Sequence, residues 1–600
     1  MFFVRGSPRN IPGVASKPFL RQQWRRNRSQ ISKDALRPTN PLAEQLSNTG
    51  LWNYGRWAKK GVKRPKGDKY RVNIVSEKLC DDTLAYIKPS LQRHLGCDII
   101  DLYPGAGLWS SKLHEALQPR SHILLEPDEA VYRPFLEPLL AKPNTTLIPK
   151  SGIIWRELNS VLDHTHLPHQ LERPAGASEP PQRNDTLLVT ANLAFHPKRR
   201  FAMFESLTQL VLYQFISSIR AASLFGKYGL VRMFVWVEGS DRHALLARSC
   251  QRRRRLAIDA ELATDSVTEV AGPDDFSQWF VRDQGLDMAS CRRVAARMAS
   301  ANVHVPPGRE SKALRAVQAA GEDDGSTPDA QPAVFARPWK EEYRSMAAQF
   351  QAGKFTTKSP EHRRLLQLQY RGNREAKVAD AVHTLLQKRD ELAAAYESSD
   401  SPTKVAALKR REAKWNAEVD ALPASSRKEF ILHRDNLHLF QQDPPVLAWD
   451  RREIEPLLVQ DTEFFPNAPC ALLDIQPKAM HPLLRAMGPA SSRSGDMFEM
   501  ILRGMMAMGA DPVSKSIETI WPGAAEGVLP HCPSLRNRSD GGMPVGGYAE
   551  LSARSLNEKQ WTELLDAWMR WPFRPSLSEL VARSAEEGDM ETEDELGDTD

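Results

Sequence analysis

From Asn73 onward, short apolar runs alternate with polar or helical stretches. A helix is expected at 76–96, where Leu79, Ile87 and Leu91 share one face. Short apolar runs between helices are typical of a parallel, doubly wound α/β sheet covered on both faces. The runs lie at 97–103, 122–127, 145–149, 185–192 and 229–237.

The pattern changes after residue 270. A linker rich in Gly, Asp and Pro covers 321–333, and a charged helical stretch covers 340–435. We interpret 271–445 as an inserted helical module with a partner-facing or solvent-facing surface. Beyond it, the pattern predicts strand-like pieces at 445–450 and 470–476, and then helices around 496–509 and 555–570.

Six segments follow from these patterns. Residues 1–48 begin with an Arg-rich stretch free of acids, so we expect them to be a mitochondrial transit peptide with a disordered lead, and we expect 49–72 to be a basic arm. The remaining segments are an α/β domain at 73–270, the insertion at 271–445, the end of the sheet with a C-terminal helical domain at 446–583, and an acidic disordered tail at 584–600.

Composition excludes several classes of protein. The chain has 600 residues, of which 41% are hydrophobic and 26% charged, which is ordinary for a globular protein. It has no apolar run of about 18 residues, so we expect no membrane span. Its six cysteines form no CxxC pair, so neither structural zinc nor a disulfide scaffold is expected, and we predict no metal site.

The N-terminus has the composition of a mitochondrial transit peptide. Residues 1–33 hold six Arg and two Lys, contain no acid and include scattered large apolar residues. A basic nucleic-acid-binding arm is the alternative. A transit peptide predicts the mitochondrial matrix as the location, with cleavage between Arg26 and Asn48.

The first candidate site follows the first strand, in the sequence DLYPGAGLWS at 101–110. Gly105 and Gly107 allow a tight turn before a helix N-terminus. Glu126 ends the next strand, where a carboxylate can accept hydrogen bonds from ribose hydroxyls. Asp101 favours S-adenosylmethionine because this cofactor carries an ammonium group. A strand–helix turn that binds nothing remains the alternative.

A second motif, Asn192-Leu193-Ala194-Phe195, ends the fourth strand. With DLYPGAG and the acid of LLEP, it resembles the rRNA adenine dimethyltransferase family. The resemblance covers about 70–270 and 445–572. It implies a Rossmann-like S-adenosylmethionine-dependent methyltransferase fold. It also implies a cofactor site and a target-base pocket; the cofactor residues would be Asp101, Tyr103, Gly105, Gly107, Glu126 and Asn192, and the base would meet Asn192 and Phe195.

The phrases DLYPG and RVNIVSEKLCDDTL (71–84) look like one branch of this family, the fungal mitochondrial transcription factors B. Three departures from the family pattern predict weak or lost methyl transfer. Ala194 stands in place of a proline, Tyr103 in place of a glycine, and the segment 148–152 lacks the family's third acid. Whether the chain is an enzyme therefore stays open at this point.

Basic segments near these motifs predict a nucleic-acid surface. Residues 56–71 hold eight bases and one acid, with Trp57 and Tyr70 among them. We expect the four arginines at 252–255 to continue a helix, with at least two of them reaching phosphates. The candidate contacts are Lys59, Lys60, Lys63, Arg64, Lys198, Arg199, Arg200, Arg252 and Arg253.

Two functions fit these observations. The first is a mitochondrial transcription initiation factor that binds promoter DNA and assists the mitochondrial RNA polymerase in promoter recognition and melting, with S-adenosylmethionine binding vestigial. The second is an active rRNA adenine dimethyltransferase that acts on small-subunit rRNA.

Overall fold

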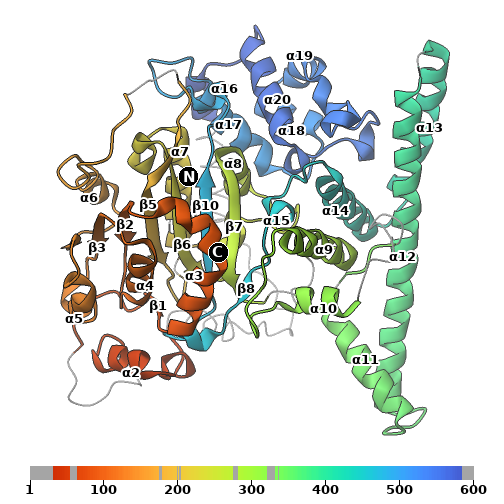
Figure 1. Ribbon diagram of the computed structural model, residues 1–600. Coiled ribbons are helices and arrows are strands. Elements are labelled where there is room, and N and C mark those ends of the chain that lie inside the picture. Colours follow the sequence, from red (N-terminus) through yellow and green to blue (C-terminus); the bar gives the residue numbers. More distant parts are fainter. Residues whose placement is uncertain are drawn as a thin grey trace, which may run out of the picture.

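The computed structural model describes residues 31–583 except 54–63, 175–178, 199, 202–203, 275–281, 321–331, 336 and 400. Its centre is an eight-stranded sheet of order β4-β3-β2-β5-β6-β10-β7-β8 (Figure 1). The strands are β2 (Asp98–Leu102), β3 (Ser121–Leu125), β4 (Thr145–Ile148), β5 (Arg183–Leu193), β6 (Leu230–Glu238), β7 (Thr264–Gly272), β8 (Leu457–Leu458) and β10 (Cys470–Pro477).

Helices cover both faces of this sheet because neighbouring residues of each strand point to opposite sides. Ile99 of β2 packs in one core with α3 (Glu77–Leu91), α4 (Leu108–Leu117) and α9 (Gln284–Ser300). Ile100 packs in the other core with α7 (Leu207–Arg220), α8 (Arg255–Ala263) and the C-terminal helices. The fold is thus a three-layer α/β arrangement, as the sequence predicts.

The sheet is mixed rather than wholly parallel. Strand β10 lies antiparallel to both β6 and β7, while β2, β3, β4, β5 and β6 are parallel to one another. The apolar runs gave no sign of β7, because its sequence TDSVTEVAG is half polar. The strand predicted at 445–450 is wrong, since this stretch contains the short helix α15 (Ala448–Arg451).

Helices fill most of the chain between β7 and β8. After α9 they are α10 (Lys312–Ala320), α11 (Pro338–Gln351), α12 (Pro360–Glu397), α13 (Pro402–Asp420), α14 (Ala424–Gln441) and α15. The 38-residue α12 stands at the edge of the molecule, beyond α9 and α14 as seen from the sheet (Figure 1).

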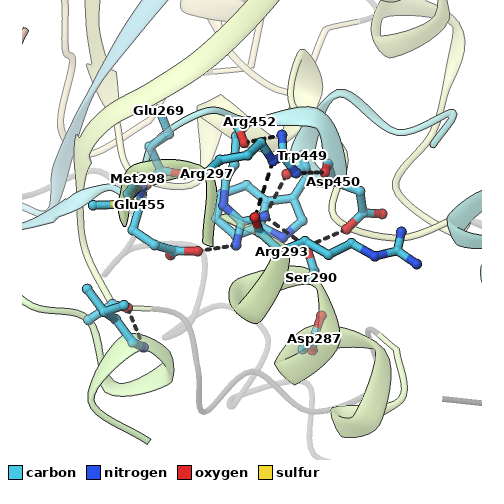
Figure 2. A network of polar contacts seen from close by, with 12 residues as sticks. Glu269, Asp287, Ser290, Arg293, Arg297, Met298, Trp449, Asp450, Arg452 and Glu455 are labelled. Atoms are coloured by element: carbon cyan, nitrogen blue, oxygen red, sulfur yellow. Dashed lines mark hydrogen bonds and ion pairs between the residues drawn. The ribbon is translucent and has the colours of Figure 1, made fainter. Parts of the chain in front are cut away.

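A buried ionic network holds the ends of this helical region together. Asp450 of α15 accepts hydrogen bonds from Arg282 at 2.8 and 3.0 Å and from the Ser290 hydroxyl at 2.6 Å. Arg297 of α9 donates to three backbone carbonyls around α15, and Arg452 pairs with Glu455 at 2.5 Å (Figure 2). Removing one partner of a buried ion pair typically costs 3–5 kcal/mol, so this network fixes α15 against α9.

The N-terminal segment packs onto the α/β core. Helix α2 (Pro41–Asn48) begins at the cap Asn40 and buries Ala43 and Leu46, and Trp52 stacks edge-on against Phe465. The expected disordered lead is therefore wrong for residues 34–36 and 41–48, which form a short 3-10 helix and α2, both held by apolar burial. The transit peptide predicted before them lies outside the described residues.

The C-terminal helices lie against the α7 and α8 face of the sheet. They are α16 (Pro482–Arg485), α17 (Ser494–Ala507), α18 (Val513–Ile520), α19 (Ala524–Val528) and α20 (Glu558–Arg570). Phe498 of α17 packs edge-on against Trp561 of α20, and both side chains are fully buried. The acidic tail at 584–600 lies outside the described residues. Among the described helices, none has the length and apolar character that a membrane span requires.

Candidate functional site

The predicted site residues meet where strand order reverses in the sheet. Strand β2 has β3 on one side and β5 on the other, with Leu102 opposite both Leu125 and Ala191. The carboxyl ends of these parallel strands therefore share one edge, and such a reversal point is the usual ligand crevice of a doubly wound sheet. The turn at 103–107, Glu126 and Asn192 all lie at this edge.

The turn after β2 needs its glycines. Gly105 has φ +59° and Gly107 has φ +71°, a region that side chains other than glycine rarely adopt. A Cβ on Gly105 would lie 2.3 Å from Asn73 Oδ1, and one on Gly107 would lie 2.5 Å from a Leu136 methyl. The glycines thus let the turn approach other parts of this same chain.

Glu126 is paired with Arg71. The guanidinium of Arg71 donates to Glu126 Oε1 at 2.5 Å and to Oε2 at 2.8 Å. The backbone N–H of Gly105 donates to Oε2 at 3.1 Å, and that of Asp128 to Oε1 at 2.9 Å. Glu126 is fully buried and therefore has no contact with bulk solvent. Both of its carboxylate oxygens accept hydrogen bonds from groups of the same chain.

Two aromatic rings enclose the Arg71 side chain. Its guanidinium carbon lies 4.6 Å from the ring centroid of Tyr103 and 4.6 Å from that of Tyr132, and Arg71 is 2% exposed. Burial alone would lower the pKa of Arg71, but the charges of Glu126 and Asp128, with Tyr132, raise it overall. The cation is therefore permanent, and cation–π contacts add to its ion pair.

The backbone beside Arg71 pairs with the Asn192 motif. Val72 donates its N–H to the Ala194 carbonyl at 2.9 Å, and His196 donates to the Tyr70 carbonyl at 2.7 Å. The side-chain amide of Asn192 donates to the Val72 carbonyl at 2.8 Å. The polar groups that would meet a target base thus have partners in the segment 70–72.

The aromatic and acidic members of the site are also buried. Phe195 is 7% exposed and packs edge-on against Tyr103, with ring centroids 6.4 Å apart. The hydroxyl of Tyr103 lies 2.7 Å from that of Ser151, and burial raises the pKa of Tyr103 to about 12. Asp101 lies 3.5 Å from His122, a residue of β3.

The arrangement does not fit S-adenosylmethionine. The resemblance places a ribose on Glu126, but Arg71 occupies both oxygens that would receive its hydroxyls. In addition, the ring of Tyr103 lies over the guanidinium of Arg71, so it reinforces the partner that holds Glu126. Among the residues that the structure describes, no group of three or more His, Cys, Asp or Glu side chains could hold a metal ion.

Comparison with known proteins confirms the resemblance. Residues 73–273 match the family described as "Ribosomal RNA adenine dimethylase". This segment is therefore similar to the domain that defines that family. Together with the order of the sheet, the match confirms the methyltransferase-like fold class that the motifs predict.

Two curated relatives are similar to part of the chain. Both are described as "Mitochondrial transcription factor 1", one from Saccharomyces paradoxus and one from Saccharomyces cerevisiae, and each is 24% identical over 169 residues. The match covers 28% of this chain and 45% of each relative, so the chain spans less than half the length of the relatives it matches.

A solved structure, "Crystal structure of a dimethyladenosine transferase from Plasmodium falciparum", matches 50% of this chain and 98% of its own. Its identity is 11% and its TM-score 0.22, a likeness too weak to add to the fold assignment.

The predicted basic contacts divide into two groups. Lys198 and Arg253 are held internally: Lys198 pairs with Asp241 at 2.7 Å, and the mostly buried Arg253 pairs with Glu261 at 2.6 Å. The expectation that 252–255 continues a helix is wrong, because α8 begins at Arg255. The exposed members are Arg64, Arg200 and Arg252, whereas Lys59, Lys60, Lys63 and Arg199 lie outside the described residues.

Sequence reasoning missed three residues that shape this site. Arg71, Asn73 and Tyr132 close the crevice, and Asn73 accepts a hydrogen bond from the Ala106 N–H at 3.0 Å. Arg71 was counted with the basic arm, where charge alone suggested a phosphate contact. One signal in the sequence was available: Arg71 directly precedes the apolar residues that enter the core, which indicates a buried rather than a surface arginine.

Proposed function

We propose that this protein is a mitochondrial transcription initiation factor that works in the matrix. It binds promoter DNA and assists the mitochondrial RNA polymerase in recognising and melting the promoter. It does so on a methyltransferase-like domain that has lost the use of its cofactor. The similarity to the two "Mitochondrial transcription factor 1" proteins supports the first part of this proposal.

The bidentate pair of Arg71 with Glu126 is the observation that carries the second part. A methyltransferase needs the donor bound and positioned, since transfer from a sulfonium depends mostly on orientation. With Glu126 neutralised and both its oxygens held, cofactor binding would have to break a buried ion pair. Removing one partner of such a pair typically costs about 3–5 kcal/mol, and a penalty of that size weakens binding by about two to three and a half orders of magnitude.

The DNA contacts that this proposal retains are the exposed ones. Arg64, Arg200 and Arg252 are free to meet phosphates at the surface. Asn192 and Phe195 are left out of the proposal, because internal partners cover them. Capture of an unstacked base at this motif would require the segment 70–72 to leave the crevice.

Promoter-dependent run-off transcription with purified mitochondrial RNA polymerase tests this function. We expect the chain to increase product from a closed duplex template, to have little effect on a pre-melted template, and to act equally with or without S-adenosylmethionine. Equal initiation from duplex promoters without the chain would overturn the proposal. Dimethylation of small-subunit rRNA by the purified chain would instead favour the enzyme.

A matched pair of variants locates the DNA contacts. The triple variant Arg64→Gln, Arg200→Gln and Arg252→Gln is expected to lower duplex-template initiation. The control removes three other exposed charges, Arg133, Lys515 and Arg570, each paired with an acid one helical turn away. Equal initiation by both variants would exclude the first three residues as contacts.

A further inference from the structure

The helical region between β7 and β10 projects its longest helix from the molecule. Helix α12 packs against α11 along its first half and against α13 and α14 along its second half. On the first half, Arg364 pairs with Glu342 of α11, and Gly372 faces Trp339 of α11. These contacts fix which side of α12 faces α11, and no helix among the described residues covers the opposite side.

A line of exposed side chains runs along that open side. Arg363, Leu366, Tyr370, Arg374 and Lys377 follow one another at steps of three or four residues, so they share one face of the helix. Tyr370 is 72% exposed and Leu366 49%, the largest apolar exposures on this helix. We call these five residues the α12 stripe.

The α12 stripe carries positive charge without internal compensation. Among the described residues, none places a carboxylate within ion-pair distance of Arg363, Arg374 or Lys377, and no acid belongs to the stripe. Between 338 and 377 the chain holds nine Lys and Arg but four acids, an excess of five positive charges. Charge excess of this kind on a projecting element favours a polyanionic partner.

A second basic face continues the surface beyond the stripe. Farther along α12, Lys388 lies on the same helix face as the stripe and pairs with Glu418 of α13. In this second half of α12, α13 therefore covers the face that is exposed in the first half. The outer surface of α13 exposes Arg410, Arg411 and Lys414, again without an ion-pair partner in the described residues.

We propose that the α12 stripe binds the backbone of double-helical nucleic acid, specifically the promoter DNA beside the melted region. The choice of DNA over RNA rests on the proposed function. The stripe runs from Arg363 to Lys377, fourteen residue steps that cover about 21 Å of the helix axis at 1.5 Å per residue. Duplex DNA presents about six base pairs over that length, with phosphates on one strand every 3.4 Å of axis.

The stripe matches this ligand in spacing and chemistry. Its cations are separated by eleven and three residues, or about 16 and 4.5 Å of helix axis, so each can reach a different phosphate. Tyr370 offers a ring and a hydroxyl to the sugar–phosphate edge. The five residues include no Asn or Gln, the side chains that read adenine, and the straight row of cations suits successive phosphates rather than base edges. The expected contact is therefore independent of sequence and sensitive to salt.

Fluorescence anisotropy of a labelled 30-base-pair DNA duplex of random sequence tests the inference, with the full chain titrated between 50 and 200 mM salt. The variant is Arg363→Gln, Arg374→Gln and Lys377→Gln. Since all three positions are exposed and Gln is a good helix former, the fold is expected to persist, which circular dichroism checks. The control is the Arg133→Gln, Lys515→Gln and Arg570→Gln variant, which loses the same net charge.

We expect the stripe variant to bind the duplex about tenfold more weakly at 100 mM salt. We also expect the slope of log affinity against log salt to fall by about 2.7, at roughly 0.9 per phosphate contact. The control should retain the affinity and slope of the parent chain. Parent-like binding by the stripe variant would overturn the proposal.

Further arms separate the alternatives. Weakened binding of an RNA duplex with unchanged DNA binding would overturn the assignment to DNA. Loss of binding to purified polymerase with unchanged DNA binding would assign the stripe to a protein partner and overturn the inference. Run-off transcription keeps the two proposals apart. If the stripe does not bind DNA but the chain still stimulates transcription, the stripe inference is wrong and the proposed function stands. If the stripe binds DNA but the chain does not stimulate transcription, the proposed function is wrong and the DNA contact stands.

Discussion

Replacing Arg71 by Met tests how the crevice is closed. Met fills a similar length between Tyr103 and Tyr132 but removes the charge that neutralises Glu126. The Glu126 carboxylate would then stay fully buried with only two backbone N–H donors. An uncompensated buried charge of this kind typically costs 3–5 kcal/mol of folding free energy, and the lost cation–π contacts add to that figure.

A double-mutant cycle isolates the interaction between the two side chains. Glu126→Gln keeps an acceptor for the Gly105 N–H while removing the charge, so the double variant Arg71→Met, Glu126→Gln no longer buries an unpaired carboxylate. We expect the double variant to be more stable than Arg71→Met alone, with a coupling energy of about 2 kcal/mol or more. The control Arg64→Met, at an exposed position of the same basic segment, should change stability by less than about 0.5 kcal/mol.

Urea unfolding and amide hydrogen exchange together measure this effect. Exchange at Gly105 reports the site directly, because its N–H donates to Glu126. We expect Arg71→Met to accelerate that exchange and to lower the urea midpoint, whereas distant amides in α20 should be unaffected under conditions of local opening. Additive single-variant effects, or an Arg71→Met chain as stable as the parent, would refute the reasoning.

Three further predictions follow from the same structure. Gly105→Ala should lower the melting temperature, because its left-handed φ costs about 1–2 kcal/mol and the new Cβ would lie 2.3 Å from Asn73 Oδ1; an unchanged melting temperature would count against this geometry. Asp450→Ala should cost about 3–5 kcal/mol and expose the helical region to limited proteolysis, and a parent-like digestion pattern would contradict that role. Burial, with the nearby charge of an arginine, lowers the pKa of His433 and of His438 to about 4, below the 6.5 of an unfolded chain. Between these two values the unfolded state binds more protons than the folded state. The free energy of unfolding should therefore be highest above pH 6.5 and should decrease as the pH falls toward 4, by up to about 3 kcal/mol per histidine. Replacing both by Gln should flatten the dependence of melting temperature on pH, and an equally steep profile would exclude them as its source.

The convergence of the site could be predicted from sequence because it depends on local pattern. Gly105, Glu126 and Asn192 each follow a buried strand, and the carboxyl ends of neighbouring parallel strands share an edge. The family resemblance of this region was likewise readable from three short motifs, and the comparison over 73–273 confirms it.

What fills the site could not be predicted in this way. Arg71 and Glu126 are 55 residues apart, and the surrounding bases made Arg71 look like one more phosphate contact. Only the tertiary fold shows that it is buried between two tyrosines. The strand at 470–476 could be predicted, but its antiparallel direction could not, since that direction depends on how the long helical region returns to the sheet.

Isothermal titration of the purified chain with S-adenosylmethionine tests the central claim most directly. If Arg71 holds both oxygens of Glu126, millimolar cofactor should give no saturable heat, and the anisotropy of bound promoter DNA should not respond to it. A saturable isotherm with micromolar affinity would show that Arg71 yields to the cofactor, and the crevice would then be a working methyl-donor site.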